Sequence, residues 1–199
     1  PDIVVACAFV NLIRVIYNDG SGGVIVNAGV ATGLTPIDVA VADFDGDGDD
    51  DVATANFDSN DVSALINDGT GLLVPTANLP LFSQPTALAF GDIDEDGDMD
   101  GVVTMGLQHE VYVLNNTGAG FVVDATTVPV GLFPFDVKLA DVDSDNHLDI
   151  ITANAASDDM SISINSGVRS FGAATHYPTG DGPIRVHVSN IDNKLGLDI

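Results

Sequence analysis

Short runs of apolar and small residues follow one another in a fixed order along the chain. A run that begins with proline, "PIDVAVAD" at 36–43, precedes an acidic stretch and a second apolar run, "DVATAN" at 51–56. A third run, "DVSALIN" at 61–67, ends in Asn-x-Gly, a turn sequence because Asn and Gly both tolerate positive φ. A looser fourth run, "GLLVPTANL" at 71–79, closes the unit. Alternation with a period of two, without helical spacing or caps, predicts four β-strands in each unit.

The unit repeats every 49 residues. Four sets of residues share this spacing: Pro36, Pro85, Pro134 and Pro183; Asn18, Asn67, Asn116 and Asn165; Asp43, Asp92, Asp141 and Asn190; and Asp2, Asp51, Asp100, Asp149 and Asp198. Four short strands in a repeat of about 40–50 residues are typical of a β-propeller blade. We therefore expect an all-β protein, a β-propeller built of four-stranded antiparallel blades. The acidic loop would connect the first and second strands of each blade.

The repeat also sets the expected domain organisation, a single array over residues 1–199. We expect a partial unit at 1–35, complete units at 36–84, 85–133 and 134–182, and a partial unit at 183–199. The two partial units together amount to one unit plus three residues, so a closed ring of four blades is arithmetically possible. We favour an array that belongs to a longer propeller or continues from one chain to the next.

Charge is concentrated in a few places rather than spread over the chain. The sequence is 45% hydrophobic with a net charge of −25, and 18 of its 30 acidic residues lie in 43–51, 92–100, 141–149 and 190–198. Only five Lys and Arg residues are present, which argues against a nucleic-acid partner or an anionic membrane surface. Apolar runs also fall short of the roughly 18–20 residues of a membrane span, so we expect no membrane insertion.

The acidic loops have the composition of a metal site. Side-chain carboxylates at positions 1, 3, 5 and 9 and a backbone carbonyl at position 7 would surround a hard cation with oxygen. The expected ligands are Asp43, Asp45, Asp47, Asp49 and Asp51; Asp92, Asp94, Asp96, Asp98 and Asp100; and Asp141, Asp143, Asp145, His147 and Asp149, with Asp49, Asp98 and His147 acting through backbone carbonyls. So many carboxylates would raise one another's pKa unless a cation lay among them. We expect about three Ca²⁺ ions, with Mg²⁺ as the weaker alternative because it prefers fewer protein ligands.

Position 6 of the loops and the fourth copy of the loop show where the metal-site pattern holds and where it breaks down. Position 6 of the loop is Gly48, Gly97 or Asn146, residues that accept a left-handed turn. The fourth copy, "NIDNKLGLD", keeps Asn190, Asp192 and Asp198 but has Lys194 at position 5 and Leu195 at position 6. We expect this degenerate site to be empty or weak, with Lys194 neutralising the carboxylates. Separately, Asn115 begins an Asn-x-Thr sequon and is a candidate for glycosylation.

The stretch "PIDVAVADFDGDGDDDVATANFDSNDVSALINDGTG" at 36–71 resembles the FG-GAP-like, or VCBS-type, repeat of bacterial surface and secreted proteins. Blades of this type are related to those of the integrin α-chain propeller. The resemblance implies a β-propeller with calcium in the loop between the first two strands. Members of the family serve in adhesion, in carbohydrate binding or as accessory parts of larger secreted proteins. Thr54, Ala55 and Asn56 stand where the family has Gly-Ala-Pro, which places this chain among divergent repeats.

These observations favour a binding function. The four histidines are scattered, and no residues form a recognisable catalytic motif. We expect a non-enzymatic, calcium-stabilised module outside the cell or on its surface, acting as an adhesion scaffold for a glycan or protein ligand. Two alternatives stay open. The chain could be a structural subunit of an extracellular fibre, assembled head to tail from copies of itself, or an accessory domain of a polysaccharide-active enzyme.

Overall fold

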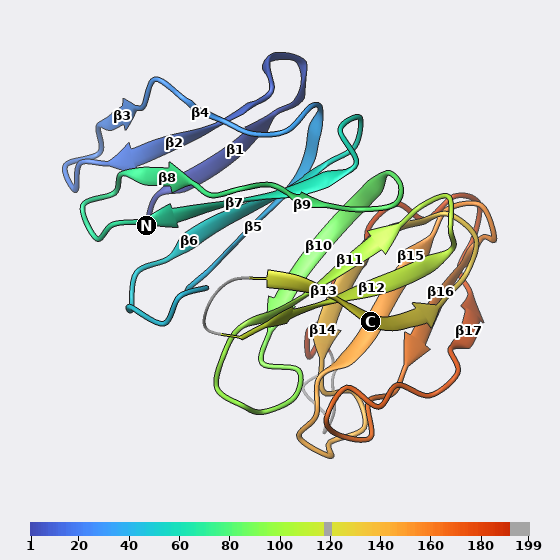
Figure 1. The fold of residues 1–199 in the computed structure, drawn as a ribbon. Coiled ribbons are helices and arrows are strands. Elements are labelled where there is room, and N and C mark those ends of the chain that lie inside the picture. The colour runs from blue at the N-terminus through green and yellow to red at the C-terminus, as the bar shows by residue number, and fades with distance from the viewer. Residues whose placement is uncertain (118–120, 192–199) are drawn as a thin grey trace.

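The computed structural model describes residues 1–117 and 121–191, apart from the side chains of residues 124 and 125. Four antiparallel sheets follow one another in chain order, and we call them blades 1 to 4 (Figure 1). Blade 1 contains β1 (Ile3–Cys7), β2 (Leu12–Asn18), β3 (Val24–Val26) and β4 (Val30–Ala31), with the 3-10 helix η1 (Ala8–Val10) between β1 and β2. Blade 2 contains β5 (Pro36–Ala42), β6 (Asp51–Asn56), β7 (Asp61–Asn67), β8 (Leu73–Pro75) and β9 (Leu79–Pro80). Blade 3 contains β10 (Pro85–Gly91), β11 (Asp100–Met105), β12 (Glu110–Asn116) and β13 (Phe121–Pro129), and blade 4 contains β14 (Pro134–Ala140), β15 (Asp149–Asn154), β16 (Asp159–Ser163) and β17 (Thr175–Pro178).

The strands of blades 2, 3 and 4 pair as antiparallel neighbours in the order of the sequence, with β9 as an additional partner of β7. The expected four-stranded antiparallel blades are therefore confirmed. The second strands β6, β11 and β15 are buried along their whole length. Each lies inside its sheet, between a first and a third strand, which explains why these segments carry few exposed polar positions.

The repeated prolines mark a local irregularity at the start of each first strand. The register shifts between Pro36 and Asp38, between Pro85 and Ala87, and between Pro134 and Asp136. Proline cannot donate to the ladder, so it is confined to strand starts, sheet edges and bulges. Each of these three prolines thus marks one bulge at the start of its blade.

The hydrophobic core lies between blades rather than within one sheet. One cluster joins Phe44 and Val62 of blade 2 to Val103, Met105 and Leu114 of blade 3. A second cluster joins blade 3 to blade 4, and a third joins blade 1 to blade 2. The first strands β5, β10 and β14 also lie next to one another. Face-to-face packing of successive blades is the arrangement that the propeller prediction requires.

The fourth strands depart from the expectation. In blade 2 the predicted strand at 71–79 is split into β8 and β9, and in blade 4 the fourth strand is only β17, preceded by an isolated bridge between Asn165 and Phe171. A fourth strand forms the outer edge of its sheet and pairs on one side only, so its pairing is less constrained. Blade 3 alone of these three has one long fourth strand, β13.

The final partial unit shows only part of what was expected. No named strand covers the described residues 183–191, although the amide of Val186 donates to Oδ2 of Asp136 at 2.9 Å and so ties this segment to β14. Asp192, Lys194 and Asp198 lie outside the described residues. Within the described part of the chain, no helix has the length and apolar character needed to cross a membrane.

Candidate metal centre

The first aspartate of each acidic loop organises the backbone around itself. Oδ1 and Oδ2 of Asp43 accept the amides of Gly46 and Gly48 at 2.8 and 3.0 Å. Oδ2 of Asp92 accepts the amide of Gly97 at 3.1 Å. The 141–149 loop repeats the arrangement, because Asp141 accepts the amides of Ser144, Asp145 and Asn146 at 2.7, 3.1 and 3.0 Å. Position 1 therefore sits at the centre of a turn that curls the loop.

Two positions in each loop have left-handed backbone. Position 6 has φ of 96° at Gly48, 96° at Gly97 and 71° at Asn146, as the sequence predicted. Position 4 is also left-handed, at Gly46, Glu95 and Ser144, with φ of 77°, 64° and 67°. Sequence reasoning missed this second position because Glu and Ser give no signal of positive φ.

The last aspartate of each loop is fully buried at the start of the second strand. Asp51 accepts the amides of Phe44 and Asn67 at 2.9 and 2.7 Å. In the 141–149 loop, Asp149 accepts the equivalent amides of Val142 and Asn165 at 2.9 and 2.8 Å. Asp100 accepts the amide of Asn116 at 2.9 Å. This carboxylate closes the loop by tying its two ends to the end of the third strand.

Two of the asparagines that recur every 49 residues, Asn116 and Asn165, have a further structural role that the sequence did not indicate. Nδ2 of Asn116 donates to the carbonyl of Met99 at 3.2 Å, and also to that of Phe44, in the preceding blade, at 2.7 Å. Asn165 does the same with the carbonyls of Leu148 and Ile93 at 3.3 and 3.1 Å. Each asparagine thus holds its own acidic loop and the loop of the blade before it.

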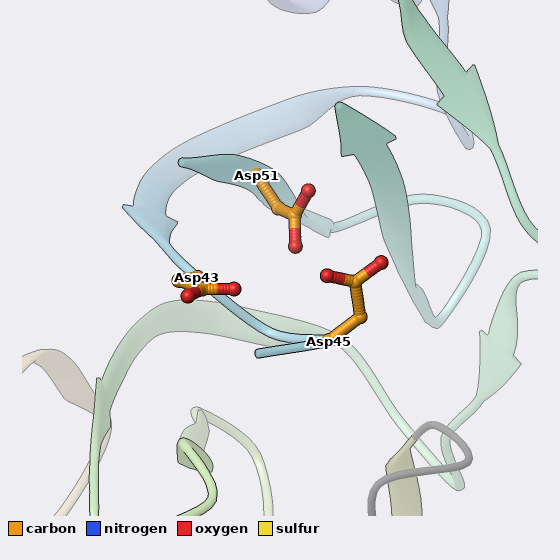
Figure 2. Close-up of side chains that lie close together, drawn as sticks. All are labelled: Asp43, Asp45 and Asp51. Carbon is orange, nitrogen blue, oxygen red and sulfur yellow. The ribbon is translucent and has the colours of Figure 1, made fainter. Parts of the chain in front are cut away.

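Three groups of carboxylates converge in these loops, and the members of each group offer oxygens within 4.8 Å of one another. The groups are Asp43, Asp45 and Asp51; Asp92, Asp94 and Asp96; and Asp141, Asp143 and Asp149. Figure 2 shows the first group, with the three side chains pointing toward a common centre.

Other predicted ligands lie in the loops without joining these groups. At position 5, Oδ1 of Asp47 accepts the amide of Asp49 at 2.9 Å, and Oδ1 of Asp145 accepts that of His147 at the same distance. Asp100, at position 9 of the 92–100 loop, is also outside its group. The backbone carbonyl role proposed for Asp49, Asp98 and His147 stays a prediction.

Buried oxygens without partners indicate that something else belongs in the 92–100 loop. Oδ1 of Asp92, Oδ1 of Asp94 and Oδ2 of Asp100 are buried and have no hydrogen-bond partner. Leaving a buried charged acceptor unsatisfied costs free energy, and a cation among these oxygens would remove that cost. The donor set is all oxygen, which fits a hard ion such as Ca²⁺ rather than zinc.

The buried carboxylates also show the electrostatic cost of the arrangement. Burial raises the pKa of Asp51, Asp100 and Asp149 above the ordinary carboxyl value, and neighbouring carboxylates such as Asp45, beside Asp51, raise it further. The amide hydrogen bonds oppose this rise. A divalent ion bound among the carboxylates would favour their ionised form.

Part of the chain matches a known repeat family. Residues 43–103 match the FG-GAP-like repeat. This segment contains the first two acidic loops and the strands between them, so the resemblance noted in the sequence is confirmed there. A search of the curated proteins found no match.

Solved structures confirm the propeller fold around the FG-GAP-like repeat. BBS1N, solved in complex with ARL6DN, matches with a TM-score of 0.61 and 15% identity over 94% of this chain and 58% of that one. A putative 6-phosphogluconolactonase from Bacteroides uniformis matches with a TM-score of 0.72 and 13% identity, over 94% of this chain and 54% of that one. A functionally unknown protein from Desulfotomaculum acetoxidans matches with a TM-score of 0.62 and 14% identity, over 89% and 58%. The chain spans less than two thirds of each of these proteins, and at such identities the likeness concerns the fold alone.

Side chains also connect the acidic loops of neighbouring blades. Nδ1 of His147 contacts Oε1 of Glu95, and this hydrogen bond raises the pKa of His147 above its ordinary value. Arg169, from blade 4, pairs with Asp94 in the 92–100 loop. Asn115, the candidate glycosylation site, lies half-buried in β12, with its Oδ1 buried.

Proposed function

We propose that this chain is a calcium-stabilised, non-enzymatic propeller module that acts outside the cell as a scaffold for binding a glycan or protein. The observation that carries the proposal is that carboxylates converge in the acidic loops of three successive blades, at positions 1, 3 and 9 in two loops and at positions 1, 3 and 5 in the 92–100 loop. A single acidic cluster could be an ordinary solvated turn. Three clusters in which the first aspartate accepts the amide of position 6, one of them with partnerless buried oxygens, are better explained by a bound ion.

The expected calcium affinity is the reason for proposing a location outside the cell. Loops of this kind in extracellular modules bind calcium with Kd values of about 10⁻⁴–10⁻³ M, which suits the calcium concentration outside cells. The single cysteine leaves the chain without an internal disulfide, so bound ions would supply the stabilisation that disulfides give to other secreted domains.

The scaffold role rests on the fold and on the family resemblance. The related propeller BBS1N was solved with a protein partner, ARL6DN, and the FG-GAP-like repeat is the resemblance that implied adhesion or carbohydrate binding. The putative lactonase has the same kind of fold, but the fold does not carry an activity from one protein to another.

Calcium removal tests the metal part of the proposal. Titration calorimetry of calcium-free protein should show about three bound ions. At a hundredfold excess over Kd, each ion contributes about 2.7 kcal/mol, or roughly 5–10 °C in melting temperature for a chain of this size. EDTA should therefore lower the melting temperature by many degrees. Absence of calcium binding would refute this part of the proposal.

Two variants of the 43–51 loop separate ligation from charge. Asp45→Ala should lower the melting temperature in calcium by roughly 5–10 °C, the contribution of one ion, and change it little in EDTA. Asp50→Ala removes the same charge from an exposed residue outside the converging group, so it should leave calcium binding intact. Equal effects of the two variants in calcium would mean that net charge, rather than ligation, is responsible.

A glycan array probes the scaffold part. Protein loaded with calcium should bind a restricted set of sugars, and EDTA should abolish the binding. Equal signals on every sugar, with or without chelator, would contradict glycan binding and leave protein ligands as the class to be screened.

A further inference from the structure

The 92–100 loop differs from the other acidic loops because a cation from the next blade enters it. Nη2 of Arg169 lies 2.8 Å from Oδ2 of Asp94, and the two side chains are only 18% and 7% exposed. Asp94 belongs to the converging group of its loop, as Asp45 and Asp143 do in theirs, but those two counterparts are exposed. The arginine therefore covers one candidate ligand and neutralises part of its charge.

The other described arginines and lysines have different partners. Lys138 and Arg185 pair with Asp136 in β14, and Arg14 donates to the carbonyl of Asn27. Within residues 1–117 and 121–191, Arg169 is thus the one Lys or Arg paired with an acidic loop.

The position of Arg169 in the repeat is unusual for a side chain of this size. Gly22, Gly71 and Gly120 precede it at intervals of 49 residues. Gly22 and Gly71 have φ of 93° and 83°, and Arg169 keeps left-handed backbone, with φ of 58°. Left-handed backbone costs a non-glycine residue more free energy than it costs glycine, and an ion pair can offset part of that cost. The ion pair with Asp94 is such an interaction.

The two carboxylate oxygens of Asp94 differ in their partners. Its Oδ2 is held by the guanidinium, while its Oδ1 is buried without a hydrogen-bond partner, as is Oδ1 of Asp92. One cation is therefore already placed where a divalent ion would bind.

We propose that Arg169 is a built-in counter-ion of the 92–100 loop, which lowers the calcium affinity of this site and stabilises the loop when calcium is absent. The affinity part rests on the function proposed above. A positive charge next to the ligands repels a divalent ion, whereas in calcium-free protein the same charge reduces repulsion among the carboxylates. The three loops would then differ in calcium dependence, with the 92–100 loop the least dependent.

Calcium titration of Arg169→Gln tests the affinity part. The variant should bind the same number of ions as the wild type, with one site tightened by about tenfold, the size expected for loss of one unit charge beside a partly screened site. Arg169→Gly, which restores the glycine of the repeat and removes the backbone strain, should give the same tightening, and Arg169→Lys should retain the wild-type affinity. Simple structural damage would weaken binding, so the expected gain distinguishes the two causes.

The affected loop can be identified by repeating the titration in a background carrying Asp43→Asn and Asp141→Asn, which weakens the other two sites. Arg185→Gln is the matched control, because it removes one positive charge whose partner, Asp136, lies outside the acidic loops. It should leave all three affinities unchanged. Unchanged or weaker binding in both Arg169→Gln and Arg169→Gly would overturn the affinity part of the proposal.

Melting in EDTA tests the counter-ion part without calcium. Arg169→Gln should lower the melting temperature in EDTA more than it does in saturating calcium, and more than Arg185→Gln does in EDTA. If the wild type binds no calcium, the proposed function fails, but this comparison still decides whether Arg169 stabilises the loop. Equal melting temperatures for the two variants in EDTA would overturn that role.

Discussion

Single aspartates outside the acidic loops join a blade to the part of the chain that follows it. Asp38 in β5 accepts the amide of Leu88 in β10 at 2.9 Å, and Asp136 in β14 accepts the amide of Val186 at the same distance. The two are 98 residues apart, so they occupy the same place in the repeat. They differ in surroundings, because Asp136 also pairs with Lys138 and Arg185.

Burial raises the pKa of the Asp38 carboxyl, whereas the Leu88 amide and the charge of Arg185 oppose the rise. A carboxyl whose pKa is higher in the folded state costs stability when it is ionised. This cost is fully present above the folded pKa and disappears below the unfolded value of about 3.9. Asp38→Asn keeps an oxygen for the Leu88 amide, so at pH 7 the variant should be more stable than the wild type. Its advantage should shrink as the pH falls toward 4.

Urea unfolding of both proteins at several pH values measures this difference. Asp136→Asn is the control, and it should lower the stability at pH 7, because it leaves Lys138 and Arg185 without their carboxylate. A loss of stability in Asp38→Asn as large as that in Asp136→Asn would show that the charge of Asp38 is needed.

The sequence identified some residues of the candidate site but not others. Aspartates 43, 45 and 51 were foreseen because carboxylates at alternate positions of a short loop repel one another unless a cation lies among them. The amide clamp on Asp51 was not, since a backbone donor leaves no mark on residue identity. Arg169 was missed for another reason. In the sequence it is only an arginine at a place where glycine otherwise recurs every 49 residues. Its partner, Asp94, lies in another blade.

Among the strands, blades 2 and 4 share a buried polar network on the second and third strands. Nδ2 of Asn56 donates to Asp61 and Ser63 at 2.6 and 2.9 Å. Asn154 makes the equivalent bonds to Asp159 and Ser161 at 2.7 and 2.8 Å. In blade 3 the corresponding positions are Met105, Glu110 and Tyr112, and Met105 and Tyr112 belong to a hydrophobic cluster instead.

The residue that precedes each blade also differs between the blades with the polar network and blade 3. Gly33 precedes blade 2 and Gly131 precedes blade 4, and the amide of each donates to a network serine, at 3.0 and 3.4 Å. The equivalent residue before blade 3 is Phe82, which is 86% exposed. Glycine thus occurs in front of the two blades whose network needs close approach of the backbone.

Gly33→Ala should therefore destabilise the protein. A Cβ at this position would lie 2.3 Å from Oδ1 of Asp61 and 2.4 Å from Oγ of Ser59, so the network would have to move. We expect a loss of about 2 kcal/mol or more, as for other disrupted buried hydrogen-bond networks. Gly172→Ala is the control, because its Cβ would meet only the carbonyl of Ile164 at 3.7 Å. Denaturant unfolding compares the two, and equal small effects would contradict the packing argument.

The strands themselves were predictable where two constraints agreed. First, second and third strands have regular alternation and end in proline, acidic or Asn-x-Gly signals, and the structure confirms them in blades 2 to 4. The fourth strand of blade 2 was predicted as one piece but is divided into β8 and β9. An edge strand pairs on one side only, so its sequence constrains its path less than that of an inner strand.

Across the molecule, the acidic loops are linked to one another rather than independent. Asn116 and Asn165 each reach a carbonyl of the preceding loop, and Glu95 contacts His147 across the junction of blades 3 and 4. Blade packing therefore holds the negative charge of successive loops close together. Three divalent ions would change the formal charge from −25 to −19 and would act where that charge is densest.

Monovalent salt should therefore stabilise the calcium-free protein more than the calcium-loaded one. Raising the salt concentration from about 0.01 M to 1 M shortens the Debye length from about 30 Å to 3 Å, which screens repulsion between loops. In EDTA the melting temperature should rise clearly with salt. In a large excess of calcium the carboxylates are already neutralised locally, so the rise should be smaller. Differential scanning calorimetry with sodium chloride and tetramethylammonium chloride separates screening from sodium binding, because both salts should act alike if screening is the cause. Equal salt effects with and without calcium would show that repulsion among the acidic loops does not limit the stability of this fold.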